Sequence, residues 1–323
     1  MANILVTGGT GFIGFHLVKH LLTKKHNVTL IDNLFRSELD EEFESIKNNV
    51  NFIQADLTKP LDDLPLTQYD HVFHLAAING VKYANNNPDK VLRTNLLATI
   101  NVLDWCVKNP PKSFVFASSS EAYHSAFDWM ELPIPTSENV PLVISNPDVN
   151  RYSYAGSKIT GELLTLNYAK MHGFNARVVR YHNIYGPRMG YDHVIPELIM
   201  RMEKNESPFK LYGAGQTRAF CYVEDAVRAT YEIGVFPGDS QHIANVGNDK
   251  EEIEIRDLCN RLFQLNKYKA SIEEVPASPG SPNRRCPDIQ KLKDLIDYNP
   301  TVSLDEGLAI TFEWYKKRLS LTV

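Results

Sequence analysis

The chain opens with a short apolar run that ends in a glycine-rich turn. The run "NILVT" (Asn3 to Thr7) is followed by "GGTGFIGFHL", in which Gly8, Gly11 and Gly14 are spaced three residues apart. Gly8 can make the tight turn out of a strand, Gly11 lets backbone approach a pyrophosphate, and Gly14 lets a helix pack closely on the strand. Unpaired amides at the start of that helix favour phosphate. The stretch predicts a dinucleotide-binding strand, turn and helix.

A carboxylate downstream strengthens this interpretation, because the glycine spacing differs from the commonest dinucleotide signature. Asp32 ends the second predicted strand and follows Gly14 by 18 residues. A carboxylate there accepts the hydroxyls of the adenosine ribose and repels a ribose phosphate, so NAD is favoured over NADP. The alternative is that Asp32 is simply a turn residue. The nearby Arg36 leaves some use of NADP open. Asp56, after the third strand, is expected to contact the adenine edge or to cap a helix.

Short β-rich runs alternate with helical patterns over the first 180 residues. Helices are expected at residues 88–108, after Pro88, and from Ser153 to His172, where Gly173 can supply a left-handed cap. This order predicts an α/β fold with a Rossmann-type doubly wound parallel sheet. The expected strands are Asn3 to Thr7, Val28 to Ile31, Asn51 to Gln54, His71 to Ala76, Ser113 to Ser118 and Ala176 to Tyr181.

Beyond Tyr181 the pattern loosens into loops rich in glycine and proline, mixed with short helices. A smaller C-terminal substrate-binding lobe is expected there, ending in the amphipathic helix "SLDEGLAITFEWYKKRL". The predicted division gives residues 1–180 to the NAD-binding domain, with 219–258 returning to it. Residues 181–218 and 259–323 form the lobe.

Composition excludes several classes of function. Of the 323 residues 43% are hydrophobic and 23% charged, and the net charge is -5, with no basic patch for nucleic acid or anionic lipid. No targeting segment or membrane-length apolar run is visible. The four cysteines have no metal or redox spacing, and no metal site is expected. We therefore predict a cytoplasmic protein that binds neither nucleic acid nor membrane.

The stretch "YSYAGSK" carries the first candidate reacting groups. Tyr154 and Lys158 are four residues apart on a predicted helix and so share one face. An ammonium beside a phenol lowers the phenol pKa from about 10. Tyr154 is then expected to act as general base on a sugar hydroxyl while hydride leaves for NAD. Lys158 is also expected to hold the nicotinamide ribose.

A second candidate group ends the fifth strand, in "FASSSEAYH". Ligands of open α/β sheets bind beyond the carboxyl ends of the strands, which places these residues well. Ser119 is the candidate to hydrogen-bond the hydroxyl that is oxidised. Glu121 follows two residues later, on the same side if the backbone stays extended, and is the candidate second base. A simple turn is the other interpretation of such a serine-rich strand end.

Taken together, these motifs resemble the extended short-chain dehydrogenase/reductase superfamily, in particular its nucleotide-sugar epimerases, dehydratases and decarboxylases. The resemblance covers essentially the whole chain, through "TGGTGFIG", "HLAA", "SSSEAY", "YAGSK", "RYHNIYGPRMG", "TRAFCYVEDA" and "RRCPDIQKLKDLIDYNPTVSLDEGL". It implies a bound NAD that oxidises carbon 4 of a nucleoside-diphosphate sugar. The predicted cofactor-binding residues are Gly8, Gly11, Phe12, Ile13, Gly14, Asp32, Asn33, Asp56, Leu57, Leu75, Ala76, Ala77, Asn95, Ser118, Tyr154 and Lys158.

The same resemblance suggests a reaction. A 4-keto sugar is acidic at carbon 5, so a carboxylate at Glu121 can start loss of the carbon 6 hydroxyl. "ASSSEAY" looks like the Thr-Ser-Glu arrangement of GDP-mannose dehydratases and UDP-glucuronate decarboxylases, with Ser119 in place of Thr. A 4,6-dehydratase is the leading prediction, and a 4-epimerase or a UDP-glucuronate-type decarboxylase is the alternative. A non-catalytic NAD-binding protein is the alternative outside enzymes, and the Tyr154 and Lys158 pair counts against it.

Substrate contacts and assembly are also implied by the resemblance. Asn183, Arg218 and Arg285 match residues that bind the nucleotide diphosphate, which an arginine fork suits. Lys82 and Ser120 are further candidate substrate-binding residues, and the 78–88 loop around Lys82 matches none of the subfamilies closely. The two long helices resemble those that pair as a four-helix bundle in dimers of this superfamily, so a homodimer is predicted. The nucleotide and the sugar stay open.

Overall fold

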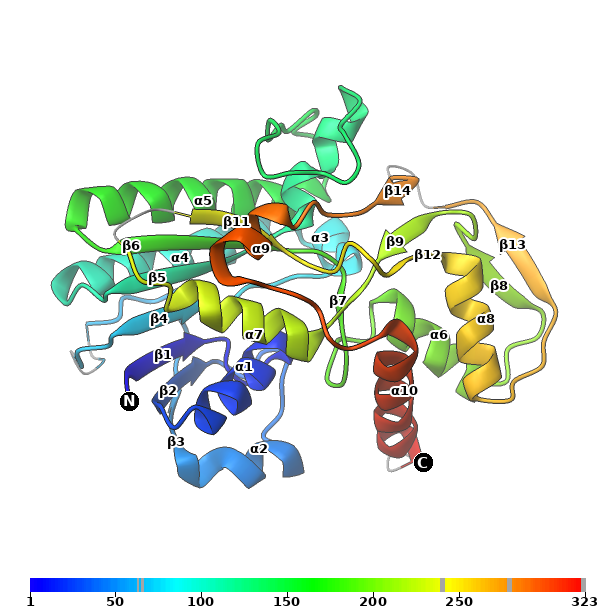
Figure 1. The fold of residues 1–323 in the computed structure, drawn as a ribbon, viewed down its shortest axis with the longest axis horizontal. Helices are drawn as coiled ribbons and strands as arrows, with labels where there is room; N and C mark the ends of the chain where they lie inside the picture. Colours follow the sequence, from blue (N-terminus) through cyan, green and yellow to red (C-terminus); the bar gives the residue numbers. More distant parts are fainter. Residues whose placement is uncertain (63, 65–66, 239–241, 278–280, 321–323) are drawn as a thin grey trace.

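Seven parallel strands form the central sheet (Figure 1), in the order β11-β6-β5-β4-β1-β2-β3. The computed structural model describes residues 1–62, 64, 67–238, 242–277 and 281–320, without the side chains of Val81 and Lys82. The strand order reverses beside β1, which pairs with β2 on one side and β4 on the other. The strands are β1 (Asn3–Thr7), β2 (Asn27–Asp32), β3 (Val50–Gln54), β4 (His71–His74), β5 (Ser113–Ser119), β6 (Asn175–Tyr181) and β11 (His242–Val246).

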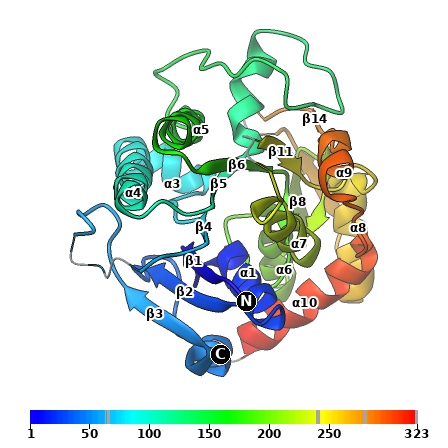
Figure 2. The same ribbon diagram turned by 60° about the vertical axis from the view of Figure 1, so that its left-hand side comes forward.

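Helices cover both faces of this sheet, which is why its central strands are apolar on both sides. Figures 1 and 2 show α4 and α5 on one face and α1 and α7 on the other. Pro88 begins α4, where its missing N–H is not needed, and Gly173 ends α5 at a φ of 75°. The bounds are α1 (Phe12–Thr23), α4 (Pro88–Lys108), α5 (Tyr152–His172) and α7 (Val223–Gly234).

Short helices connect the strands at the edges of the sheet. They are α2 (Glu41–Ile46), the 3-10 helix η1 (Lys47–Asn49), α3 (Val81–Asn86) and the 3-10 helix η2 (Ser120–Asp128). The backbone therefore leaves the extended conformation at Ser120, directly after β5. Glu121 was expected to lie on the same side as Ser119 only if the backbone stayed extended. It does not stay extended, so that expectation is corrected.

A smaller lobe lies beyond the carboxyl ends of the strands. It holds two small sheets, in the orders β12-β9-β14 and β13-β8, together with three helices. Its elements are α6 (Val194–Glu203), β8 (Phe209–Tyr212), β9 (Thr217–Ala219), β12 (Glu252–Glu254), α8 (Ile255–Leu265), β13 (Ile272–Val275), β14 (Arg284–Arg285) and α10 (Leu304–Ser320). Between sheet and lobe, β7 (Ile184–Tyr185) pairs with β10 (Cys221–Tyr222), and α9 (Gln290–Ile296) packs near β11.

The predicted fold class is confirmed: a doubly wound parallel sheet with a smaller lobe. The chain crosses between the two parts more than once, because α7 and β11 join the seven-stranded sheet after β9 has entered the lobe. The stretch 219–258 is divided, since β12 pairs with β9 in the lobe. Within the described ranges, none of the helices has the length and apolar character needed to cross a membrane.

Candidate active site

The glycine turn is held so tightly that side chains would not fit. Gly8 has a φ of 69° and donates its N–H to the Ile31 carbonyl at 2.8 Å. A methyl group on Gly14 would lie 2.0 Å from the Gly8 carbonyl oxygen, and one on Gly8 would lie 2.8 Å from the Ala76 Cα. Gly11 caps α1 with extended backbone and no side-chain bond to the first amides. The turn therefore presents unhindered backbone N–H groups at a helix start.

A cavity of about 540 Å³ opens at this turn, along the carboxyl ends of β1, β2, β4 and β5. Each predicted cofactor-binding residue lines it, from Gly8 through Asn33, Leu57 and Asn95 to Lys158. Arg36, named above for NADP use, lines it too, and so do Phe35, Tyr83 and Arg188, which were not predicted to bind the cofactor. The cavity combines room for a dinucleotide with a glycine turn and a strand-end carboxylate. These features fit NAD.

Asp32 has the geometry expected of a ribose-binding carboxylate. It ends β2, lines the cavity, and accepts backbone N–H bonds from Thr10 at 3.2 Å and Leu34 at 2.9 Å. Each bond uses a different oxygen, so the carboxylate is fixed in place with acceptor capacity left over. Asp56 also lines the cavity, and it caps the Thr58 N–H at 2.9 Å.

Exchanging this carboxylate for an amide tests the cofactor preference. Asp32→Asn is expected to weaken NAD binding about tenfold or more, because hydrogen bonds to a charged group contribute about 1.5–3 kcal/mol. The loss of charge repulsion is expected to improve NADP binding relative to NAD. Isothermal titration of the variant with both cofactors gives the ratio. An unchanged preference for NAD would remove the role assigned to Asp32.

Asn95 ties the loop after β4 to the helix that carries the tyrosine. Its Oδ1 accepts from the Ile78 N–H at 2.7 Å, and its Nδ2 donates to the Ile78 carbonyl at 3.0 Å and to Ser157 Oγ at 3.1 Å. Both ends of the amide are thus engaged by protein. Its contribution to the cavity is to position that loop against α5.

Tyr154 and Lys158 lie one turn apart on α5, and both line the cavity. The Tyr154 hydroxyl is hydrogen-bonded to the Ser119 side chain, and the Lys158 Nζ lies 5.5 Å from the tyrosine ring centroid. That nitrogen donates to the Ala117 carbonyl at 2.8 Å. Three candidate residues, Ser119, Tyr154 and Lys158, therefore meet at the carboxyl end of β5.

The structure corrects the expectation that the Lys158 ammonium lowers the pKa of the Tyr154 phenol. Burial raises the pKa of Tyr154 above its ordinary value, and the Ser119 hydrogen bond offsets only part of this. Burial also lowers the pKa of Lys158, to about 8. The ammonium faces a backbone carbonyl rather than the phenol oxygen. For Tyr154 to act as a base, further positive charge must offset the burial of the phenolate.

Glu121 lies among positive charges. Its Oε1 accepts from Arg285 Nη1 at 2.9 Å and its Oε2 from Arg151 Nη2 at 3.4 Å. Burial opposes ionisation, but the charges of Arg285, of His124 when it is protonated at low pH, and of Arg151 outweigh it and lower the pKa of Glu121 to about 2. A carboxylate held in this way is a weak base, which counts against the expected proton removal at carbon 5.

His124 completes this group. Its Nδ1 accepts from Arg285 Nη2 at 3.1 Å, and its buried Nε2 has no hydrogen-bond partner among the described residues. Burial lowers the pKa of His124 to about 4, so the ring is neutral at pH 7. Arg285 therefore bridges a carboxylate and an imidazole. No role was predicted from the sequence for Arg151 or for His124.

The other predicted substrate residues are divided. Burial lowers the pKa of Arg218 to about 10, the charge of Arg285 adds to this, and its Nη2 donates to Gln216 Oε1 at 3.1 Å. We call Arg151, Arg218 and Arg285 the arginine cluster. Asn183 has a φ of 43° and donates its amide to the Ala219 carbonyl at 3.0 Å. Ser120 is buried at the start of η2, and Lys82 lies in α3 with its side chain outside the described part.

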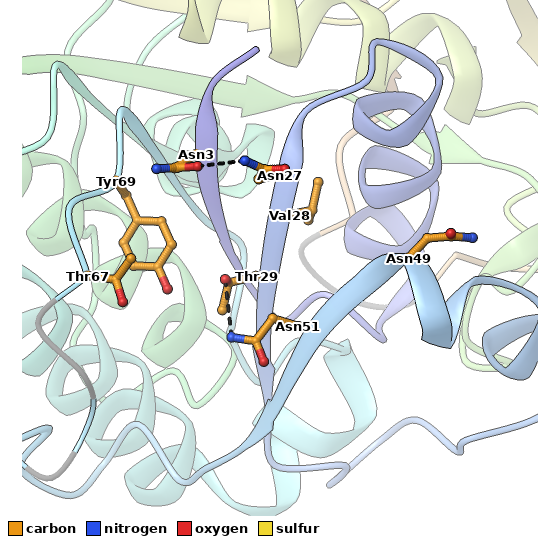
Figure 3. Close-up of a pocket in the computed structure, with 8 residues that line it drawn as sticks. All are labelled: Asn3, Asn27, Val28, Thr29, Asn49, Asn51, Thr67 and Tyr69. Atoms are coloured by element: carbon orange, nitrogen blue, oxygen red, sulfur yellow. Dashed lines mark hydrogen bonds between the residues drawn. The ribbon is translucent and has the colours of Figure 1, made fainter.

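A second hollow, of about 290 Å³, lies at the opposite ends of the strands (Figure 3). Three of its asparagines are hydrogen-bonded within it: Asn27 Nδ2 donates to Asn3 Oδ1 at 3.0 Å, and Asn51 Nδ2 donates to Thr29 Oγ1 at 3.5 Å. It lies at the amino ends of β1, β2 and β3, away from Tyr154. The chemistry-bearing side chains gather in the first cavity and beside it.

Comparison with known proteins agrees with this architecture. A model of the NAD dependent epimerase/dehydratase family matches residues 4–247. The UDP-N-acetyl-alpha-D-glucosaminuronate decarboxylase of Bacillus cytotoxicus is 34% identical over 325 residues, covering 97% of each protein. UDP-glucuronic acid decarboxylase 6 of Arabidopsis thaliana is 33% identical, covering 99% of this chain and 90% of that protein.

A solved structure is similar over nearly the whole chain as well. A mutant UDP-glucuronic acid 4-epimerase of Bacillus cereus, in complex with UDP-4-deoxy-4-fluoro-glucuronic acid and NAD, superposes with a TM-score of 0.86. The two are 29% identical, over 98% of this chain and 99% of that one. The family model spans the glycine turn, the tyrosine helix and the returning strand β11. The chain therefore belongs to the NAD dependent epimerase/dehydratase family and is an NAD-dependent enzyme.

Proposed function

We propose that this enzyme decarboxylates a UDP-linked uronic acid through a 4-keto intermediate. The observation that carries the proposal is the arginine cluster, which surrounds Glu121 with more positive than negative charge next to the Ser119 and Tyr154 pair. A substrate with a diphosphate and a sugar carboxylate matches that excess. Two relatives of full length are named as decarboxylases of UDP-linked uronic acids, which supports the same substrate class.

The state of Glu121 favours decarboxylation over dehydration. Dehydration needs a base to take the proton on carbon 5, and Glu121, with a pKa of about 2, is poorly suited to that. A 4-keto uronate is a β-keto acid and needs no such base. The electron pair of the bond between carbons 5 and 6 moves into the ketone, carbon dioxide leaves, and carbon 5 of the resulting enolate then takes up a proton. The 4,6-dehydratase, which is the leading prediction from the sequence, thus becomes the weaker hypothesis.

The residues divide the work between them. Ser119 and Tyr154 hold the hydroxyl on carbon 4, and Tyr154 accepts its proton during oxidation. The arginine cluster orients the anionic parts of the substrate, with Glu121 and His124 fixing the position of Arg285. NAD, when bound in the cavity, accepts the hydride from carbon 4 and later returns it. We further propose that the seven-stranded domain holds NAD and the lobe holds the nucleotide sugar.

A UDP-uronate 4-epimerase is the second candidate, favoured by the similarity to the Bacillus cereus epimerase. Both reactions start with oxidation at carbon 4, so the same Ser119, Tyr154 and Lys158 serve either one. They differ in whether the carboxylate survives and in the face to which hydride returns. A product analysis therefore separates them.

Product masses test the proposal. The purified protein is incubated with UDP-glucuronate, UDP-N-acetylglucosaminuronate, UDP-glucose, GDP-mannose and dTDP-glucose, with and without added NAD. We expect a UDP-uronate to lose one carbon dioxide, and the Tyr154→Phe variant to serve as the inactive control. Loss of water from any sugar would restore the dehydratase. An unchanged mass, with inversion at carbon 4 seen by NMR, would establish the epimerase.

The homodimer stays a prediction from the resemblance. The two helices expected to form its interface, α4 and α5, pack against each other on one face of the sheet (Figure 2). Leu163 and Met171 on α5 are exposed, at 58% and 76%. These apolar side chains support a partner surface on that face.

The cytoplasmic location also stays a prediction.

A further inference from the structure

A buried ion pair lies directly behind the tyrosine and lysine. Glu162 follows Lys158 by one turn of α5, and its side chain is 4% exposed. Its Oε1 accepts from Arg180 Nε at 2.9 Å and its Oε2 from Arg180 Nη2 at 2.6 Å. Ser118 Oγ donates to the same Oε1 at 2.5 Å. Both residues of the pair are thus fixed and almost fully buried.

The pair is built by the fold at this point. Arg180 lies on β6, directly opposite Ser118 on β5, so the guanidinium and the hydroxyl reach the carboxylate from neighbouring strands. Arg180 Nη1 also donates to the Tyr123 hydroxyl at 2.7 Å. Such a pair contributes little to stability compared with apolar packing, because desolvation offsets the attraction. A role beyond packing is therefore worth seeking.

The neighbouring charge on the same helix is Lys158. Residues four apart on a helix share a face, and the ammonium bonds the Ala117 carbonyl of the strand that carries Ser118. Tyr154 on α5 places a neutral ring beside the ammonium, and Arg180 on β6 is a second cation, which is bonded to Glu162. His74 on β4 is neutral, because burial lowers its pKa to about 3. Glu162 is the acidic residue whose charge acts on the ammonium.

We propose that Glu162 is a positioning residue that keeps Lys158 in its charged form, with Arg180 and Ser118 holding the carboxylate in place. The inference rests on the proposed function, in which Lys158 holds the nicotinamide ribose. Burial of the ammonium lowers the pKa of Lys158 to about 8, and Glu162 opposes that effect. Without the carboxylate, a larger share of Lys158 becomes neutral at pH 7. A neutral amine does not orient a ribose hydroxyl as a charged donor does.

A direct titration of the lysine tests the proposal. The protein is labelled with ¹³C-lysine, and the Cε resonance of Lys158 is assigned by its loss in Lys158→Met. In Glu162→Gln, the pKa read from this resonance is expected to fall by about one pH unit or more. Activity needs the charged lysine, so it is present below the lysine pKa and lost as pH rises through it. The alkaline limb of kcat is therefore expected to move to lower pH by the same amount. The other lysine resonances are internal controls.

Two further variants separate electrostatics from structure. Glu162→Gln leaves Arg180 buried without its partner, and that alone can unfold the protein. Glu162→Gln combined with Arg180→Leu removes both charges, and we expect Lys158 to titrate below its parent value there too. Glu197→Gln makes the same change at an exposed ion pair with Arg201 and is expected to leave the Lys158 curve in place.

A Lys158 resonance that titrates as in the parent, in either Glu162 variant, would overturn the proposal even if kcat fell. The titration needs no substrate. Failure of the parent to convert any UDP-uronate would therefore count against the proposed function and not against this inference.

Discussion

Replacing Tyr154 by phenylalanine is expected to lower kcat by about 10²- to 10⁴-fold, the range typical of a lost acid–base group. The change removes only the hydroxyl that is hydrogen-bonded to Ser119. The ring stays in the cavity, against the Lys158 ammonium, and NAD binding is expected to be retained. Steady-state kinetics with the substrate found by product analysis, together with calorimetric titration of NAD, measure the two effects separately.

Tyr152 provides a matched control on the same helix. Its hydroxyl is hydrogen-bonded to the Asp128 carboxylate, and it does not line the cavity. Tyr152→Phe removes an equivalent group and is expected to reduce stability by about 1 kcal/mol while kcat stays near that of the parent. Equal kcat in Tyr154→Phe and the parent would exclude Tyr154 from the chemistry.

Gly14→Ala is expected to have the largest effect on the folded cofactor site. The added methyl group would lie 2.0 Å from the Gly8 carbonyl oxygen, which is backbone and has little room to move. Either α1 or the glycine turn must shift, and we expect a loss of about 3 kcal/mol or more in the free energy of unfolding. Because the turn is predicted to present its amides to the pyrophosphate, NAD binding is expected to disappear. Denaturant unfolding and calorimetry test both.

Gly156→Ala is the control for this substitution. Gly156 lies within α5, next to the catalytic candidates, and a methyl group there meets nothing within 4 Å. A glycine in a helix interior is less stable than alanine by about 0.5–1 kcal/mol. Gly156→Ala should therefore stabilise the protein slightly. If Gly14→Ala were as stable as Gly156→Ala and still bound NAD, the tight turn would not explain the glycine.

The features that the sequence predicted are those encoded by neighbouring residues. The glycine turn, the buried strands and the four-residue spacing of Tyr154 and Lys158 depend only on local periodicity. The residues lining the cavity followed because the carboxyl ends of parallel strands meet at one edge. The strand ends were less certain: β4 ends at His74, two residues before the predicted Ala76.

Local sequence patterns could not predict which residues surround Glu121. Arg285 is 164 residues away along the chain, and only the fold brings it to the carboxylate. Arg151 lies beyond the long loop after η2, and nothing in its neighbourhood marks it. The phenol pKa depends on burial, which a motif does not report. One signal was missed: Arg180 interrupts the apolar strand "ARVVRY", and a charge there implies a buried partner such as Glu162.

The repeated crossing between sheet and lobe also affects the order in which the protein can be completed during synthesis. The sheet is not finished until β11 has been made, and α7, which covers β5 and β6, is made only after the first three elements of the lobe, α6, β8 and β9. A nascent chain that has just passed Tyr181 therefore exposes an apolar face of the sheet. The glycine turn is translated before the other residues of the cavity, yet the domain around it closes only when β11 (His242–Val246) has been translated.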